Sequence, residues 1–199
     1  MRFKALVAFV VGACQAVAVA CHGYLDVPAA RNVQHWSHYC PQCLNGPGVC
    51  GDPEGVHDHE AFGLFANPPR VADTFERGAT MRAHVVITAN HGGRWGLEVC
   101  KLRAGQRELR SCFKRLKRAD GRGRYVYVPP SASESTAAFK LPKNLTCERC
   151  VVRWRWETGN SCTPKGTPRK YANPGLQTCG TGTAPPMEAF TNCADVRII

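Results

Sequence analysis

The sequence predicts an all-β protein, an antiparallel β-sandwich with a long, disulfide-pinned loop region towards its N-terminal end. Short runs in which every second residue is apolar recur from residue 81 onward, and turn residues separate them. No long stretch has the apolar periodicity of an α-helix. Ten cysteines follow residue 21, as expected of an exported chain that is cross-linked by disulfides.

The first 21 residues predict a secretory signal peptide rather than a part of the domain. Arg2 and Lys4 form a charged start, an apolar run over residues 5–20 follows, and small residues precede the expected cut. The run is shorter than the roughly 20 residues that a membrane-spanning helix needs. We therefore expect a secreted, extracellular protein without a membrane anchor, whose single domain covers residues 22–199.

The strand signals follow a segment that has none. Residues 22 to about 67 are rich in glycine, proline, cysteine and histidine, and they predict an irregular region that cannot form a core alone. The predicted strands cover residues 81–88, 97–102, 125–128, 137–141, 150–157 and 193–199. Trp154 and Trp156 alternate with charged residues, so both rings are expected in the core. This succession is typical of immunoglobulin-like or fibronectin-III-like sandwiches.

Ten cysteines remain once residues 1–21 are removed, and their even number predicts up to five disulfides. Two Cys-x-x-Cys pairs have a spacing that would also suit zinc, but export and the long gap between the pairs favour disulfides. Connectivity does not follow from the sequence, although Cys100 and Cys112 could join a hairpin. The ten are Cys40, Cys43, Cys50, Cys100, Cys112, Cys147, Cys150, Cys162, Cys179 and Cys193.

The chain is basic, with 26 Lys and Arg against 15 Asp and Glu. Loss of Arg2 and Lys4 with the signal peptide leaves a net charge of +9. Such a charge attracts polyanions, such as acidic glycans, heparin-like chains or nucleic acid. The cations are densest in residues 101–124, which predicts a solvated loop or hairpin, and no nucleic-acid-binding motif accompanies them. We expect no nucleic-acid partner.

Two of the seven histidines beyond residue 21 stand out. Cleavage after residue 21 would give His22 a free α-amine beside its imidazole, and those two nitrogens can chelate a metal. His91 ends a predicted strand and precedes Gly92 and Gly93, where glycines allow close approach of a ligand or backbone. On position alone it is an ordinary turn histidine. The pairs His35/His38 and His57/His59 could each bind a metal weakly, but loop positions near turns are favoured for both, and His84 fits a strand position.

Hydrolytic chemistry is not favoured by the sequence. Asp52, Glu54, Asp58 and Glu60 are carboxylates of one loop region, but nothing pairs them as an acid and a base. The cysteines are expected in disulfides, so no thiol nucleophile is predicted either. Asn144 begins the only predicted glycosylation acceptor, Asn-Leu-Thr, as suits an exposed turn.

Four segments, in this order, resemble the lytic polysaccharide monooxygenases, most of all auxiliary-activity family fifteen. The resemblance to family ten, which contains the chitin-binding type 4 domains, is more distant. Together the segments span almost all of the chain beyond residue 21, so the match is specific although each segment alone is weak. They are HGYL at 22–25 with Pro28 and Arg31, ITANHGG at 87–93, CVVRWRWETGNS at 150–161, and EAF at 188–190 with CADV at 193–196.

The resemblance implies one copper ion held by a histidine brace. Its ligands would be the amine and imidazole of His22 and the imidazole of His91, a nitrogen set that suits copper. The implied reaction is oxidative cleavage of glycosidic bonds in an insoluble polysaccharide, chitin or cellulose. It needs an external electron donor and oxygen or hydrogen peroxide, and the enzyme is expected to be a monomer.

The resemblance also assigns residues around the metal. Phe190 matches the axial position, where a phenyl ring cannot ligate copper, and Ala89 matches a small residue that shapes access. Glu188 and Gln177 are the candidates for a nearby hydrogen-bonding group. Met187 stands where relatives often carry glutamine, so this part of the pattern is disturbed.

Three aromatic residues near the brace in sequence, Tyr24, Trp36 and Trp95, are candidates for stacking on sugar rings. Packing inside the domain is the alternative for each, since aromatic residues dominate protein cores. Two other functions remain open at this point. One is a non-catalytic protein that binds chitin or another wall polysaccharide, and the other is a secreted copper carrier or sensor.

Overall fold

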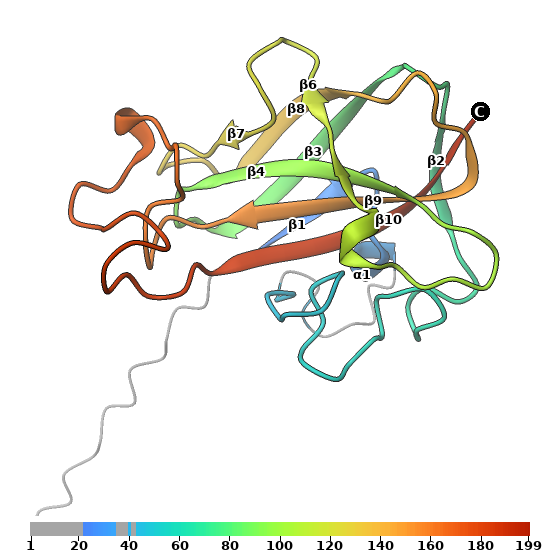
Figure 1. The fold of residues 1–199 in the computed structure, drawn as a ribbon, viewed down its shortest axis with the longest axis horizontal. Helices are drawn as coiled ribbons and strands as arrows, with labels where there is room; N and C mark the ends of the chain where they lie inside the picture. The colour runs from blue at the N-terminus through green and yellow to red at the C-terminus, as the bar shows by residue number, and fades with distance from the viewer. Residues whose placement is uncertain (1–21, 35–39, 41–42) are drawn as a thin grey trace, which may run out of the picture.

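The computed structural model describes residues 22–34, 40 and 43–199 (Figure 1). The predicted signal peptide and Trp36, His35 and His38 lie outside the described residues. In the described part, no helix is both long enough and apolar enough to cross a bilayer. The elements are β1 (His22–Val27), α1 (Arg31–Gln34), β2 (Val71–Phe75), β3 (Thr80–Ala89), β4 (Arg94–Lys101), η1 (Arg110–Cys112), β5 (Lys114–Arg115), β6 (Lys117–Arg118), β7 (Val126–Tyr127), β8 (Glu134–Lys140), β9 (Cys147–Glu157), η2 (Arg169–Tyr171) and β10 (Ala189–Ile198).

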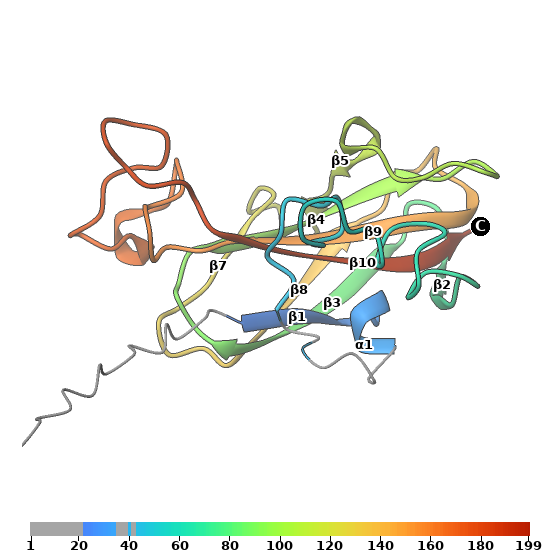
Figure 2. The ribbon, with the colours of Figure 1, turned by 90° about the horizontal axis from the view of Figure 1, so that it is seen from below.

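Two sheets pack face to face, and the predicted β-sandwich is confirmed (Figures 1 and 2). The first sheet has the strand order β1-β3-β8-β6. The second has the order β2-β10-β9-β4-β5, and β7 also pairs with β4. All pairings are antiparallel except that of β2 with β10, which is parallel and departs from the purely antiparallel prediction.

The main core lies between the two sheets. Met81 and Val85 of β3 point inward from the first sheet, as the alternation over 81–88 predicts. Trp154 and Trp156 point inward from β9 in the second sheet and are fully buried, so the prediction that both belong to the core is confirmed. Phe190 of β10 packs beside Trp156, with ring centroids 5.4 Å apart.

The second sheet is covered on its other face as well. Cys50 and Ala61 of the segment after α1 pack on Val151 and Cys193, outside the main core. Because of this cover, the charged residues that alternate with Trp154 and Trp156 are not all exposed, and Arg153 is buried. A buried charge needs a partner, and Arg153 Nε donates to Glu98 Oε2 at 2.8 Å.

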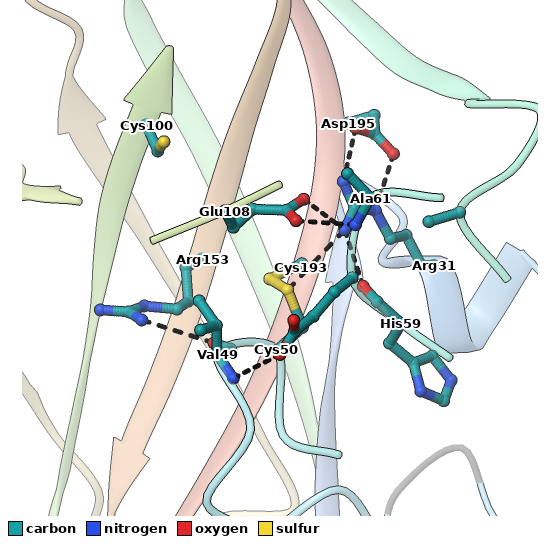
Figure 3. Close-up of polar contacts among 12 residues, drawn as sticks. Arg31, Val49, Cys50, His59, Ala61, Cys100, Glu108, Arg153, Cys193 and Asp195 are labelled. Carbon is teal, nitrogen blue, oxygen red and sulfur yellow. Dashed lines mark hydrogen bonds and ion pairs between the residues drawn. A yellow bond between two sulfur atoms is a disulfide. The ribbon is translucent and has the colours of Figure 1, made fainter. Parts of the chain in front are cut away.

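A buried arginine joins this covering segment to the sheet (Figure 3). Arg31 of α1 is only 2% exposed. Its Nη2 and Nε atoms contact the two carboxylate oxygens of Asp195 at 2.7 and 2.8 Å. Its Nη1 donates to the His59 carbonyl at 2.7 Å and lies 2.7 Å from Glu108 Oε1. One guanidinium therefore connects α1, β10 and two loops.

All ten predicted cysteines form disulfides. The pairing of Cys100 with Cys112 is confirmed, and each Cys-x-x-Cys pair closes on itself, which excludes the zinc alternative. Cys50–Cys193 joins the covering segment to β10. The five bonds are Cys40–Cys43, Cys50–Cys193, Cys100–Cys112, Cys147–Cys150 and Cys162–Cys179.

The sequence prediction is wrong for the start of the domain. Residues 22–67 were expected to be irregular throughout, but β1 pairs with β3 along its length. Its inward positions are Gly23 and Leu25 only, so the alternation is too short and too weak in apolar residues to predict a strand. β2 has half-buried and exposed positions only, which explains why it too gave no signal.

Candidate metal centre

The pairing of β1 with β3 brings the two predicted metal ligands to one edge of the sandwich. His22, the first residue of β1, is the Cα partner of Ala89, the last residue of β3. His91 follows two residues later, and both histidines are half-buried. Two histidines from distant parts of the sequence thus lie at the same end of the paired strands β1 and β3, where β3 ends and a turn begins.

Trp156 lies beneath both histidine-bearing segments. A Cβ atom on Gly23 would lie 3.2 Å from Trp156 Cζ3 and 2.9 Å from the Val86 carbonyl oxygen, so only glycine allows β1 to lie this close. The Trp156 Nε1–H donates to the Gly92 carbonyl at 2.8 Å. One buried ring therefore supports the residue after His22 and the residue after His91.

The turn that carries His91 is fixed by hydrogen bonds from its neighbours. Asn90 Oδ1 accepts from the Gly92 N–H at 2.7 Å, and Asn90 Nδ2 donates to the carbonyls of Pro129 and Ala132 at 2.8 and 2.6 Å. The His91 carbonyl accepts from the Gly159 N–H at 2.9 Å. These bonds hold the backbone of His91 from both sides.

The residues predicted around the metal fall into two groups. Phe190 is 0% exposed and packs on Trp156, the ring that supports both histidine-bearing segments, and Ala89 is half-buried. Glu188 lies beside the His91 turn, because its carboxylate accepts from Asn160 Nδ2 at 2.8 Å and its carbonyl from the Thr158 N–H at 3.1 Å. Gln177 is exposed further along the loop.

The disulfide Cys40–Cys43 also lies beside His22. A ring nitrogen of His22 and the two sulfurs lie within 4.8 Å of one another. Metal-binding cysteine acts as a thiolate, whereas these sulfurs are bonded to each other. The cluster is therefore a histidine packed against a disulfide, and its imidazole is the ligand it offers.

Of the three aromatic residues proposed to stack on sugars, Trp95 is a wrong prediction. It is 0% exposed, its ring packs on Phe139 at 5.5 Å, and its Nε1–H donates to Ser135 Oγ at 3.0 Å. The inward positions Leu97 and Val99 of the same strand already predict this burial. Tyr24 is half-buried on β1; burial and the nearby Asp26 carboxylate raise the pKa of its hydroxyl.

The loop carboxylates have structural partners. Asp52 Oδ1 lies 2.7 Å from His59 Nδ1, with both side chains buried, and Glu60 Oε2 lies 2.9 Å from His57 Nδ1. They belong to the segment that covers the second sheet rather than to the edge that carries His91.

A cleft of about 510 Å³ opens directly beside His91, and sequence analysis missed it. Asn160, Lys170, Tyr171 and Asn173 of the connection between β9 and β10 form its other side. Tyr171 stacks on Tyr127 of β7, with ring centroids 5.2 Å apart and an interplanar angle of 10°. The composition of the connection could have given a signal, because residues 160–187 contain three cations and no acid.

The chain matches the family model described as lytic polysaccharide mono-oxygenase, cellulose-degrading, over residues 44–196. It is similar to a lytic polysaccharide monooxygenase AA15 from Thermobia domestica, in the Cu(I) state, with 28% identity and a TM-score of 0.74, covering 89% of this chain and 98% of that one. No curated protein matches the chain.

Two further solved structures share the fold at lower identity. An AA10 lytic polysaccharide monooxygenase from Streptomyces lividans is 17% identical, with a TM-score of 0.55 over 88% of this chain and 99% of that one. A chitin binding domain from Burkholderia pseudomallei is 15% identical, with a TM-score of 0.54 over 90% and 100%. With a family model that matches most of its length, the chain belongs to the lytic polysaccharide monooxygenase family.

Proposed function

We propose that the mature protein is a secreted, copper-dependent monooxygenase that cleaves glycosidic bonds of chitin or cellulose oxidatively, with His22 and His91 as a histidine brace. The observation that carries this proposal is the register of β1 on β3, which pairs His22 with Ala89, two residues before His91. The family of the chain supports the oxidative chemistry.

The donor set fits copper once the signal peptide is removed. Within the precursor, the nitrogen of His22 belongs to a peptide bond, where resonance withdraws its lone pair. Cleavage after residue 21 turns it into an amine, and the site then offers one amine and two imidazoles. Nitrogen ligands of this kind suit copper, and the disulfide beside His22 leaves no thiolate to compete.

Bound copper would supply the redox chemistry that activates oxygen or peroxide with electrons from an external donor. The chain supplies position and surroundings. Trp156 holds the residues next to both histidines, and Phe190 places a buried phenyl ring, without any ligand atom, behind them. Glu188 places a carboxylate, which can accept or release a proton, beside the turn that carries His91.

Copper titration of protein that begins at His22 tests the brace. We expect one tight site, and we expect His91→Ala and a form that begins Met-His22 both to lose it. His84→Ala is the matched control, because His84 lies on β3 but contacts Asp26 and Glu134. Tight binding that survives in the His91→Ala or Met-His22 form would contradict the brace.

Product analysis then separates the enzyme from the two alternatives. Oxidised oligosaccharides that require both copper and a reductant support the monooxygenase. Binding to chitin without such products would support a non-catalytic binding protein, and copper binding without affinity for any polysaccharide would support a carrier. Secretion and glycosylation belong to the same proposal: Asn144 lies exposed between β8 and β9, where a glycan fits.

A further inference from the structure

The cleft beside His91 has an uneven distribution of charge. Lys170, Tyr171 and His91 are the titratable residues that line it, and no Asp or Glu of the described chain does so. The connection that forms its outer side carries Lys165, Arg169 and Lys170, all exposed, and no acid over residues 160–187. Glu188 does not line the cleft, but its carboxylate accepts from Nδ2 of the lining residue Asn160 at 2.8 Å, so the positive field is that of the Lys170 side of the wall.

Some polar groups of the cleft are already hydrogen-bonded within the described chain, and others are not. Asn90 donates to two carbonyls and accepts from Gly92, so its amide is fully engaged. Asn173 Oδ1 accepts from the Gly175 N–H at 3.1 Å, while its Nδ2 donates to no other described residue. Lys170 makes no ion pair within the described chain, and its Nζ lies 4.9 Å from the Tyr171 ring centroid. Two donors thus remain for a ligand.

The wall that presents these donors is held in place. Cys162–Cys179 closes the connection, and the Tyr127 hydroxyl donates to the Gly166 carbonyl at 3.1 Å. Arg94 Nη1 donates to the Lys165 carbonyl at 2.7 Å. A volume of about 510 Å³ is within the usual range for small-ligand sites, roughly 300–1,000 Å³. The cleft is an ordered site rather than a gap beside a loose loop.

We infer that this cleft binds a carboxylate-bearing sugar unit, so that the protein binds acidic polysaccharide containing uronic acid in addition to the chitin or cellulose it is proposed to cleave. Lys170 Nζ and Asn173 Nδ2 would donate to the carboxylate, and Tyr171, which stacks on Tyr127 and lies under Lys170 Nζ, would help to hold the lysine in place. A charge-assisted hydrogen bond is roughly twice as strong as a neutral one. Neutral chitin or cellulose would leave Lys170 without a charged partner. The inference rests on the proposed function in treating this cleft as part of the substrate surface.

Binding to polygalacturonate and to its fully methyl-esterified form tests the inference, because the two polymers share a backbone and differ in charge. With protein that begins at His22, we expect at least about tenfold tighter binding to the acidic polymer at low salt. Lys170→Gln should remove most of this preference, and Lys170→Arg should keep it. A sulfated glycan without carboxylates, run alongside, should bind less tightly than polygalacturonate.

Lys117→Gln is the matched control for the loss of one positive charge. Lys117 of β6 is exposed and pairs through Lys140 with Thr80, at the end of β3 remote from His91. Equal weakening by Lys117→Gln and Lys170→Gln, or equal affinity for the two polymers, would overturn the inference. So would tighter binding of the sulfated glycan.

These outcomes are separable from the proposed oxidation. If copper and reductant yield oxidised products from chitin while the Lys170-dependent preference is absent, the inference fails and the proposed function stands. If the preference depends on Lys170 but no polysaccharide is oxidised, the cleft stands as an acidic-sugar site and the proposed function fails.

Discussion

Two long connections flank the second sheet, and they are built in opposite ways. In the described part of residues 28–67, most charged groups are buried against the sheet: Arg31, Asp52 and Glu60 are almost inaccessible, whereas Glu54 is exposed. Residues 158–188 keep their cations in solvent: Lys165, Arg169 and Lys170 are exposed. One connection is part of the interior of the domain, while the other forms the cleft beside His91.

The buried connection stabilises the domain, whereas the exposed connection can vary with less effect on folding. Burial would lower the pKa of Arg31, but hydrogen bonds from its guanidinium to Asp195 and the charge of Glu108 raise it above the ordinary value. A charge held this way tolerates little change. The exposed connection contacts the domain through a few hydrogen bonds and the stack of Tyr171 on Tyr127, so substitutions there should alter binding more than folding.

The disulfides of the two connections close loops of very different length. Cys50–Cys193 closes a loop with a sequence separation of 143, and Cys162–Cys179 one of 17. On chain entropy, removing the first should cost about 5 kcal/mol and removing the second about 3 kcal/mol. We expect urea unfolding of the two Cys-to-Ser double variants to show this order.

Local opening of residues 158–188 should increase the difference between the stability losses of the two double variants. If residues 158–188 can loosen without unfolding the sheets, the Cys162→Ser/Cys179→Ser variant will lose less global stability than chain entropy predicts, while its affinity for polygalacturonate falls. Equal losses of global stability in the two double variants would show that both connections are integral to the domain. The proposed difference between the two connections would then be wrong.

Replacing the buried arginine should be nearly as damaging. Arg31→Met keeps an unbranched side chain but leaves Asp195 and Glu108 without their buried cation, at a cost of about 4 kcal/mol. Arg149→Gln is the control: Arg149 Nε also donates to Asp195 Oδ1, at 2.8 Å, but is partly exposed. We expect it to cost about 1 kcal/mol. Thermal unfolding of both variants measures the difference.

Acid should weaken the buried connection before the exposed one. Burial would raise the pKa of Asp195, but hydrogen bonds from Arg31 and Arg149 lower it below its ordinary value. A lowered folded-state pKa stabilises the fold above the unfolded pKa of about 3.9, and this contribution is lost as the pH falls through the folded value. We expect stability to fall below about pH 4.

Glu98 also has a lowered pKa, so it contributes to the loss of stability in acid in the same direction as Asp195. The Asp195→Asn variant isolates the contribution of Asp195. Burial raises the pKa of Glu98, but Arg153 and Arg115 lower it overall. The stability difference between the native protein and Asp195→Asn should therefore shrink between about pH 5 and pH 2. A constant difference over this range would show that Asp195 does not carry the acid dependence.

Much of the interior could be predicted from the sequence, because burial leaves a regular pattern there. Met81, Val85, Trp154 and Trp156 occupy alternate positions of strands that are buried on one face at least, and the structure confirms them. The cysteines could be counted, but their partners could not be derived. Which cysteine meets Cys193 depends on how a long irregular segment folds back over β10.

The cleft could not be predicted because no local pattern encodes it. His91, Tyr127 and Tyr171 come from three separate segments, and only the folded sheets bring them together. Arg31 shows the same limit in the interior. An arginine in a polar segment predicts exposure, and its burial follows from acids far away in the sequence.

The smallest effect should come from Tyr127, the residue on which the exposed connection rests. Tyr127→Phe keeps the stack with Tyr171 and removes the hydroxyl that donates to Gly166, at a cost of about 1 kcal/mol or less. Tyr127→Ala removes the ring pair as well, which should cost roughly a further 0.5–1.5 kcal/mol of stability in this connection.

Trypsin cleavage measures how often this connection opens, because Lys165, Arg169 and Lys170 lie in it. We expect cleavage there to accelerate about tenfold in Tyr127→Ala and a few-fold in Tyr127→Phe, while the urea midpoint of the domain hardly moves. Should Tyr127→Ala lower global stability as much as Arg31→Met does, the connection would unfold only with the sheets. The contrast between a buried structural connection and an independent binding wall would then be wrong.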